Sequence, residues 1–258
     1  MRHGLAILLV SLSCVWCSGG QQTPAAAESL KSLHERADQG DAQAQNDLGA
    51  MYYAGQGVAQ DYAEALRWYR KAAEQGNAGA QYNLGLMYCN GQGVAQNYAE
   101  AGKWYRKAAD QGQAEGQYNL GSMYALGQGV TQDYAEAFRW FSRAATQGQA
   151  DAQYNLALMY ALGKGVPQDY AEAAKWYRKA AEQGYAKAQN NLGIMYVRGQ
   201  GVPQDFVQAH MWTNLAASRL TGDQQKKCAA VRDLLAGRMT PVQLAEALAL
   251  AQNWKPKK

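Results

Sequence analysis

The sequence predicts an all-α fold, namely an α-solenoid of five 36-residue helix-turn-helix repeats with helical caps at both ends. The first observation behind this prediction is the stretch 77–112, which has close copies before and after it at a constant period. The second is that each copy contains two segments with apolar residues at helical spacing. The third is that glycines separate these segments at fixed positions, where a sharp turn needs them. Together they indicate a stack of helix pairs.

The repeat register is strict over most of the chain. The predicted units are 41–76, 77–112, 113–148, 149–184 and 185–220. A tryptophan recurs once in each unit, as Trp68, Trp104, Trp140, Trp176 and Trp212. A helix pair of this length is too small to bury its own apolar face, so neighbouring units must stack to form a continuous core.

The first helix of a unit, called helix A below, is shown well by the second unit. Here Ala78–Asn90 places Leu84, Met87 and Tyr88 on one apolar face. Gly85 lies in the middle of this helix, although glycine there costs ~1 kcal/mol relative to alanine. Because glycine or alanine recurs at this position in every unit, we expect a neighbouring helix to approach the backbone closely there.

The second helix of a unit, called helix B, follows the glycine-rich segment Gly91–Val94. Two glycines supply the positive φ angles of a sharp reversal. A phosphate-binding loop is excluded, because that motif requires a preceding strand and a further glycine. Asn97 is a predicted N-cap, and Trp104 and Tyr105 belong to an apolar stripe that lies opposite charged residues. Helix B is therefore expected to bury one face and to solvate the other.

The ends of the repeat array are predicted to be caps. The segment 28–40 is expected to form an N-terminal capping helix, and 221–254 two C-terminal capping helices, followed by the basic tail 255–258. The fifth unit departs from the common pattern, and its closing glycine is displaced to Gly222. Thr240 and Gln243 predict a capping box at the start of the second of these helices. The side chains predicted to cover the exposed C-terminal end are Leu234, Leu235, Leu244, Leu248 and Trp254.

The N-terminus is typical of an export signal. Residues 1–20 are predicted to be a signal peptide, because Arg2 precedes an apolar segment, Leu5–Cys17, that is too short to span a membrane. A short linker, 21–27, follows it. The mature chain would then have no transmembrane segment and would lie in the periplasm or be secreted. A lipid anchor at Cys14 and an uncleaved anchor remain as alternatives.

Charge and composition exclude several function classes. The net charge is +4, and the excess comes from the two ends of the chain, so the repeats are electrically balanced and do not indicate a nucleic-acid partner. Three histidines are present, His3, His34 and His210, and none stands in a catalytic or metal-binding motif. We therefore expect no catalytic residue, no metal site and no cofactor. Cys89 and Cys228 are predicted to be buried free thiols.

The repeated motif A-x-A-Q-Y-N-L-G-x-M-Y-x-x-G-x-G-V-x-Q-D-Y-x-E-A-x-x-W-Y resembles the Sel1-like repeat, a relative of the tetratricopeptide repeat. The resemblance covers 41–220 and implies an α-solenoid that acts as an adaptor or scaffold, with exported bacterial members linked to the envelope. A cysteine-rich secreted branch of the family is associated with β-lactam binding or hydrolysis. This chain departs from that branch, because it has only Cys89 within its repeats and no S-x-x-K motif. An envelope hydrolase or β-lactam-binding protein is therefore kept only as the alternative function.

Positions at which the units differ predict where a protein or peptide partner would bind. On helix A, two rows of such positions lie apart from the core face, and the concave side of related solenoids carries helix A. The predicted partner-binding residues are Asn46, Tyr82, Leu86, Tyr118, Ser122, Tyr154, Leu158, Asn190 and Ile194. Aromatic side chains with a polar tip suit such interfaces. The alternative is that the tyrosines only pack between neighbouring helices A.

Overall fold

A computed structural model describes residues 30–257, and in this part of the chain it contains thirteen α-helices and no strand. The predicted signal peptide, the linker 21–27 and Cys14 lie outside the described residues. The helices are α1 Leu30–Asp38, α2 Ala42–Ala54, α3 Tyr62–Glu74, α4 Ala78–Asn90, α5 Tyr98–Asp110, α6 Ala114–Leu126, α7 Tyr134–Thr146, α8 Ala150–Leu162, α9 Tyr170–Glu182, α10 Ala186–Arg198, α11 Phe206–Ala217, α12 Gly222–Ala236 and α13 Pro241–Asn253. The all-helical prediction is confirmed, including the bounds of helix Ala78–Asn90.

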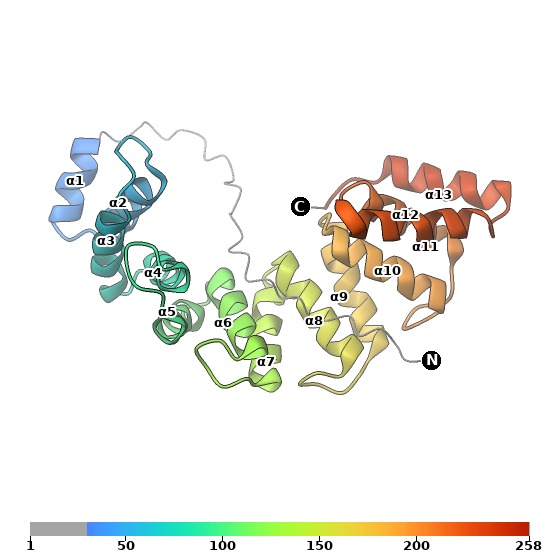
Figure 1. Cartoon of the computed structure of the whole chain (residues 1–258), viewed down its shortest axis with the longest axis horizontal. Helices are drawn as coiled ribbons and strands as arrows, with labels where there is room; N and C mark the ends of the chain where they lie inside the picture. Colours follow the sequence, from blue (N-terminus) through green and yellow to red (C-terminus); the bar gives the residue numbers. More distant parts are fainter. Residues whose placement is uncertain (1–29, 258) are drawn as a thin grey trace. The chain divides into compact units, whose positions relative to one another are not determined.

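The chain divides into two compact units, which we call unit 1 and unit 2 and describe separately. Unit 1 ends at Asp133 and holds α1–α6, whereas unit 2 begins at Tyr134 and holds α7–α13. In unit 1, α2 packs against α3 and α4 packs against α5, so these two helices A each lie on their own helix B (Figure 1). In unit 2 the pairs are α8 with α9 and α10 with α11.

The turn between the helices of a pair explains its two glycines. Gly91 has a φ angle of 69° and caps α4, and Gly93 has a φ angle of 68°. A Cβ atom on Gly93 would lie 2.4 Å from the carbonyl oxygen of Tyr62, in helix B of the preceding repeat. The second glycine therefore serves two purposes, because it permits the reversal and lets the turn lie directly on the neighbouring backbone.

The glycine within helix A has a different reason. A Cβ atom on Gly85 would lie 2.7 Å from the ring of Tyr105, which packs flat on that position from the paired helix α5. The close approach expected from the sequence is confirmed, and the approaching group is an aromatic side chain. Ala157 takes this position in the fourth repeat and is fully buried near Tyr177, so one methyl group is tolerated there.

A buried glutamine near the start of α4, and likewise of α8, ties three helices together. The side chain of Gln81 is 4% exposed, and its Nε2 donates to the carbonyl oxygen of Ala73 at 3.1 Å. Its Oε1 accepts a hydrogen bond from Nε2 of Gln111 at 2.7 Å. The same contacts recur at Gln153 in unit 2. Both ends of a buried amide are thus satisfied, which a buried polar side chain requires.

The glutamine contacts show that α12 continues the repeat register. Nε2 of Gln225 donates to the carbonyl oxygen of Ala217 at 3.2 Å, as Gln189 does to Ala181 one repeat earlier. The helix begins at Gly222, one full repeat after the first residue of α10, Ala186. The prediction that Gly222 is a displaced closing glycine is therefore wrong, since Gly222 is the first residue of a sixth helix A.

The last helix, α13, explains why the fifth repeat departs from the pattern. It packs against α11 instead of pairing with α12. The sequence of α11 contains no Asp, Glu, Lys or Arg, whereas the outer face of other helices B is charged. Trp254, just after α13, lies edge-on to Trp212 with ring centroids 6.3 Å apart. Because α13 covers this outer face, charged side chains there would be buried without water.

The cap residues behave only partly as the sequence predicts. Leu235 is buried, and Leu244 and Trp254 are partly buried, but Leu234 is 59% exposed and Leu248 is 47% exposed. For Leu248 the reason is the rotation of α13, which turns Ala247 and Ala251 toward the core. The capping box predicted at the start of α13, with Thr240 and Gln243, is present.

Candidate functional site

In unit 1, four of the predicted partner-binding residues are partly exposed on helices A. They are Asn46 on α2, Tyr82 and Leu86 on α4, and Tyr118 on α6. The side chain of Asn46 already has one partner within the fold, because its Oδ1 accepts a hydrogen bond from Nδ2 of Asn83 on α4 at 3.2 Å. The ring of Tyr82 lies 5.9 Å from that of Tyr105, so packing within the repeat uses part of its surface.

The fifth predicted residue of unit 1, Ser122, is fully buried at 0% exposure. Its hydroxyl has no hydrogen-bond partner in the structure. A side chain without exposed surface does not reach a partner, so Ser122 is removed from the candidate surface. The sequence row placed it beside Leu86, and only the surrounding packing distinguishes the two positions.

In unit 2, Tyr154 is mainly a packing residue. Its ring centroid lies 5.7 Å from that of Tyr177 and 5.1 Å from that of Tyr185. Burial raises the pKa of Tyr154, and a hydrogen bond with the side chain of Asn191 opposes that shift. Packing therefore uses much of the Tyr154 ring, and it involves Tyr177 of the paired helix B, α9, as well as Tyr185, just before α10.

The remaining predicted residues of unit 2 differ in how much surface they offer. Asn190 on α10 accepts a hydrogen bond from the thiol of Cys228 on α12 at 3.0 Å, so its side chain is engaged by the helix that follows. Leu158 on α8 and Ile194 on α10 occupy equivalent positions and are partly exposed. Leu162, one turn beyond Leu158, is 41% exposed. These apolar side chains form the accessible centre of the candidate surface.

Sequence reasoning missed the part of this surface that α12 supplies. Since α12 is a sixth helix A, Lys226 continues the row of Tyr154 and Asn190. Ala230 continues the row of Leu158 and Ile194, and both α12 residues are exposed. The signal that would have found them is Gln225, which stands one full repeat after Gln189.

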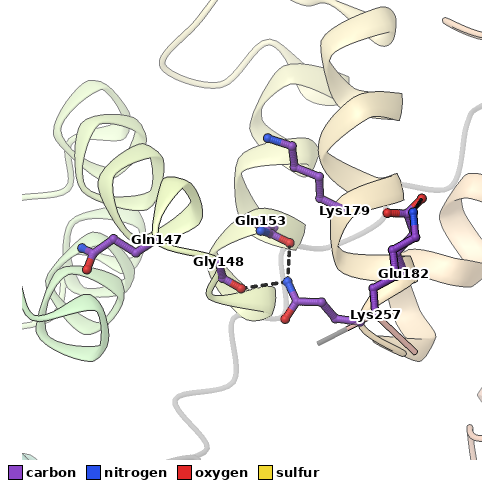
Figure 2. A pocket seen from close by; sticks show the side chains of 7 residues that line it. Gln147, Gly148, Gln153, Lys179, Glu182 and Lys257 are labelled. Carbon is purple, nitrogen blue, oxygen red and sulfur yellow. Dashed lines mark hydrogen bonds and ion pairs between the residues drawn. The ribbon is translucent and has the colours of Figure 1, made fainter. Parts of the chain in front are cut away.

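A separate hollow of about 440 Å³ lies in unit 2, where the C-terminal tail meets the ends of α7 and α9 (Figure 2). The residues that line it are Gln147, Gly148, Gln153, Lys179, Glu182, Gln183 and Lys257. Nζ of Lys257 pairs with Glu182 at 3.0 Å, and Nε2 of Gln183 donates to Gln153 and Gly148. Its polar groups thus serve the fold, and no side chain in it is a nucleophile paired with a base.

Burial shifts the pKa of titratable groups in the core, among them His210 and Cys228. His210 is 2% exposed, its Nδ1 has no hydrogen-bond partner, and burial lowers its pKa. Burial raises the pKa of the Cys228 thiol, which disfavours the reactive thiolate. Cys89 and Cys228 are both buried free thiols, as predicted. Between residues 30 and 257, no three His, Cys, Asp or Glu side chains gather as metal ligands, and no helix there has the length and apolarity to cross a membrane.

Comparison with known proteins gives a family match over most of the chain. The Sel1 repeat family matches residues 42–77, 78–113, 114–149, 150–185 and 186–219. A crystal structure of a Sel1 repeat protein from Oxalobacter formigenes is 34% identical, has a TM-score of 0.73, and covers 88% of this chain and 91% of that one.

Two other solved structures are similar in sequence but superpose less well. The protective antigen c5321 of uropathogenic Escherichia coli is 30% identical, with a TM-score of 0.45 over 87% of this chain and 63% of that one. A putative Sel1 repeat protein from Klebsiella pneumoniae is 25% identical, with a TM-score of 0.48 over 79% of this chain and 97% of that one. No curated protein sequence matches the chain.

Proposed function

Since the chain belongs to the Sel1 repeat family, whose members generally mediate protein–protein interaction, we propose that it is a non-enzymatic scaffold or adaptor. In this proposal it is exported to the bacterial envelope and binds a partner peptide or protein on its helix-A surface. The fold suits this role, because stacked repeats expose a row of helices A to which an extended partner has access.

The observation that carries the proposal is the accessible apolar surface on the helices A of unit 2. Leu158 and Ile194 stand at equivalent positions of neighbouring helices, and Leu162 is 41% exposed. The outer faces of the regular helices B differ, since they carry ion pairs such as Glu172–Lys175 at 2.5 Å. Exposed apolar side chains at the centre of a surface are typical of binding sites, whereas paired charges are typical of a solvated face.

The proposal is tested by photo-crosslinking in the native envelope. A photoreactive amino acid replaces Ile194 on α10 in one variant and Leu158 on α8 in another. Two control variants carry it at Lys103 and Lys175, which are exposed on helices B. We expect a defined protein adduct from the helix-A positions and none from the controls. Equal adducts from all four positions, or no adduct from any, would contradict the proposal.

The alternative function, an envelope hydrolase or β-lactam-binding protein, has a direct test. Purified protein is assayed for nitrocefin turnover, and Cys89, the only cysteine within the repeats, is replaced by alanine in a control. We expect no turnover above the background rate, because the thiols of Cys89 and Cys228 are both buried. Turnover that the purified chain retains at high purity would overturn the non-enzymatic proposal.

Export to the periplasm or beyond rests on the apolar segment near the N-terminus, which lies outside the described residues. Mass spectrometry of the mature N-terminus tests it. Cleavage near residue 20 is the expected result, and a diacylated Cys14 would instead establish a lipid anchor.

A further inference from the structure

Positive charge is distributed unevenly among the helices A. The four helices α2, α4, α6 and α8 contain no lysine or arginine. Both later helices A contain them, as Lys187 and Arg198 on α10 and Lys226, Lys227 and Arg232 on α12. All five lie in unit 2, and the repeat pattern does not require any of them, because earlier helices A fold without basic residues.

The basic residues of unit 2 differ in whether they have an acidic partner. Arg232 pairs with Asp233 at 2.7 Å. In the described part of the chain, Arg198, Lys226 and Lys227 are exposed and take part in no ion pair. On helices B the arrangement is the opposite, since a glutamate pairs with the basic residue three positions later. The helix-B pairs are Glu64–Arg67, Glu100–Lys103, Glu136–Arg139 and Glu172–Lys175.

Two of these cations lie near the accessible apolar residues, Arg198 in the row of Leu162 and Lys226 in a neighbouring row. Arg198 on α10 holds the same repeat position as Leu162 on α8 and Leu234 on α12. These two leucines are 41% and 59% exposed. Lys226 ends the row of Tyr154 and Asn190, next to the row of Leu158 and Ile194. A third row, Asp151, Lys187 and Asp223, alternates in sign and adds little net charge. We call Leu158, Leu162, Ile194, Arg198, Lys226 and Leu234 the α8–α10–α12 surface.

We propose that the α8–α10–α12 surface binds an acidic, amphipathic segment of a protein partner. Apolar side chains of that segment would pack on Leu158 and Ile194, and its carboxylates would pair with Arg198 and Lys226. The inference rests on the proposed function and adds the chemistry of the partner. Charge complementarity of this kind selects among partners and speeds their association.

The composition of the surface favours an acidic peptide over other anionic partners. A nucleic acid offers a continuous phosphate backbone, and its binding would call for a larger cluster of basic residues than three. A membrane surface would call for a helix with a large apolar face and many basic residues, which none of the three helices has. On the α8–α10–α12 surface, single leucines and an isoleucine lie among a few cations. A peptide in which apolar and acidic side chains alternate would complement this arrangement.

The test uses a displayed library of random 12-residue peptides, panned against the mature full-length protein. The variant Arg198→Glu/Lys226→Glu reverses two charges on the surface, and Lys103→Glu/Lys175→Glu reverses two on helices B as a matched control. We expect the selected peptides to be rich in Asp and Glu with interspersed Leu or Ile. Their affinity is expected to fall about tenfold or more in the surface variant, to be nearly unchanged in the control, and to weaken with added salt.

Several outcomes overturn the inference. They are the absence of any selected peptide, selection without acidic enrichment, and equal affinity for the surface variant and the control. Stronger binding to anionic lipid vesicles or to duplex DNA, lost in the surface variant, would assign the cations to another partner class. Circular dichroism melts confirm that each variant folds. Crosslinking at Ile194 could capture a protein that binds the charge-reversed variant as tightly as the wild type. The scaffold function would then be supported, and the inference of an acidic partner would be wrong.

Discussion

Helices α5 and α11 hold the same place in their repeats, yet only one of them has a charged outer face. On α5 the outward positions include Lys103 and Lys107, and the equivalent positions of α11 are Met211 and Leu215. Water covers the first helix, and α13 covers the second. The comparison teaches that in this fold the core face follows the repeat, whereas the outer face follows whatever lies against it.

The turn within a repeat and the start of α12 also differ in how they use glycine. Gly93 in the regular region and Gly222 at the start of α12 both have positive φ angles, 68° and 60°. A Cβ atom on Gly93 would strike the backbone of Tyr62, whereas nothing lies within 4 Å of one on Gly222. The turn at Gly93 therefore packs directly on a neighbouring backbone, whereas the start of α12 at Gly222 does not.

The largest expected effect comes from Gly93→Ala. Strain at the positive φ angle and the contact with Tyr62 should together lower the free energy of unfolding of the regular region by ~3 kcal/mol. Gly222→Ala is the matched control and should cost ~1 kcal/mol, because only backbone strain applies. Urea unfolding followed by circular dichroism measures both. Equal costs would show that the close approach at Gly93 does not contribute.

Removal of Trp254 should have the next largest effect. Trp254→Ala deletes the ring that packs on Trp212 and over which the Arg219 guanidinium lies at 4.7 Å, so α13 should detach at a cost of ~2–3 kcal/mol. The uncharged outer face of α11 would then be exposed, and binding of a hydrophobic dye should rise. Leu248→Ala on α13 is the control, since its side chain is 47% exposed. A dye signal that stays at the wild-type level would mean that α13 does not cover α11.

The repeated glutamine of helix A should contribute more to stability at Gln81 on α4 than at Gln225 on α12. Gln81→Ala removes a side chain that is 4% exposed and makes hydrogen bonds to both Ala73 and Gln111, so we expect a loss of ~2 kcal/mol. Gln225→Ala removes one hydrogen bond from an exposed residue and should cost ~0.5 kcal/mol. Thermal melts of the two variants compare them. The reverse order would show that α12 depends on this contact more than a regular helix A does.

The smallest expected effect is a pH dependence confined to the C-terminal region. Burial lowers the pKa of His210, and the nearby Arg232 also lowers it while Asp233 opposes. The unfolded chain therefore binds a proton near pH ~6.5 that the folded chain does not bind. Stability should fall as the pH drops below this value, and be fully present above it.

The measurement for His210 is the unfolding midpoint at pH 5 and pH 7.5. His210→Gln should reduce the difference between the two midpoints, whereas the control His34→Gln should leave it unchanged. If the His210 variant keeps the full wild-type pH dependence, another group is responsible.

Much of the fold was predictable because its determinants are local. The N-cap at Asn97, the capping box of Thr240 and Gln243, and the turn glycines Gly91 and Gly93 are all confirmed in the structure. Each acts through backbone geometry or a hydrogen bond within a few residues, so neighbouring sequence is enough to reveal it. The prediction that Gly222 closes the fifth repeat is wrong because the repeat motif is weak around α12. Gln225 is the residue there that keeps the repeat register.

The candidate site was predictable only in part. The rows of helix A follow from the repeat period, and Tyr82, Leu86 and Ile194 in these rows are partly exposed. The burial of Ser122 and the contact between Asn190 and Cys228 depend on neighbouring helices. Those contacts join residues far apart in the chain, which a row of equivalent positions does not describe. Whether the surface binds a partner stays a prediction.

By itself, the sequence determined the helix pairs, the repeat register and the membership of a repeat family, because a periodic pattern of apolar side chains specifies which face each helix buries. The tertiary structure alone decided how the array ends: α12 adds a sixth helix A, and α13 lies on α11 instead of beside α12. It also decided which helix-A side chains remain exposed, since exposure depends on what packs around a residue and not on its place in the repeat.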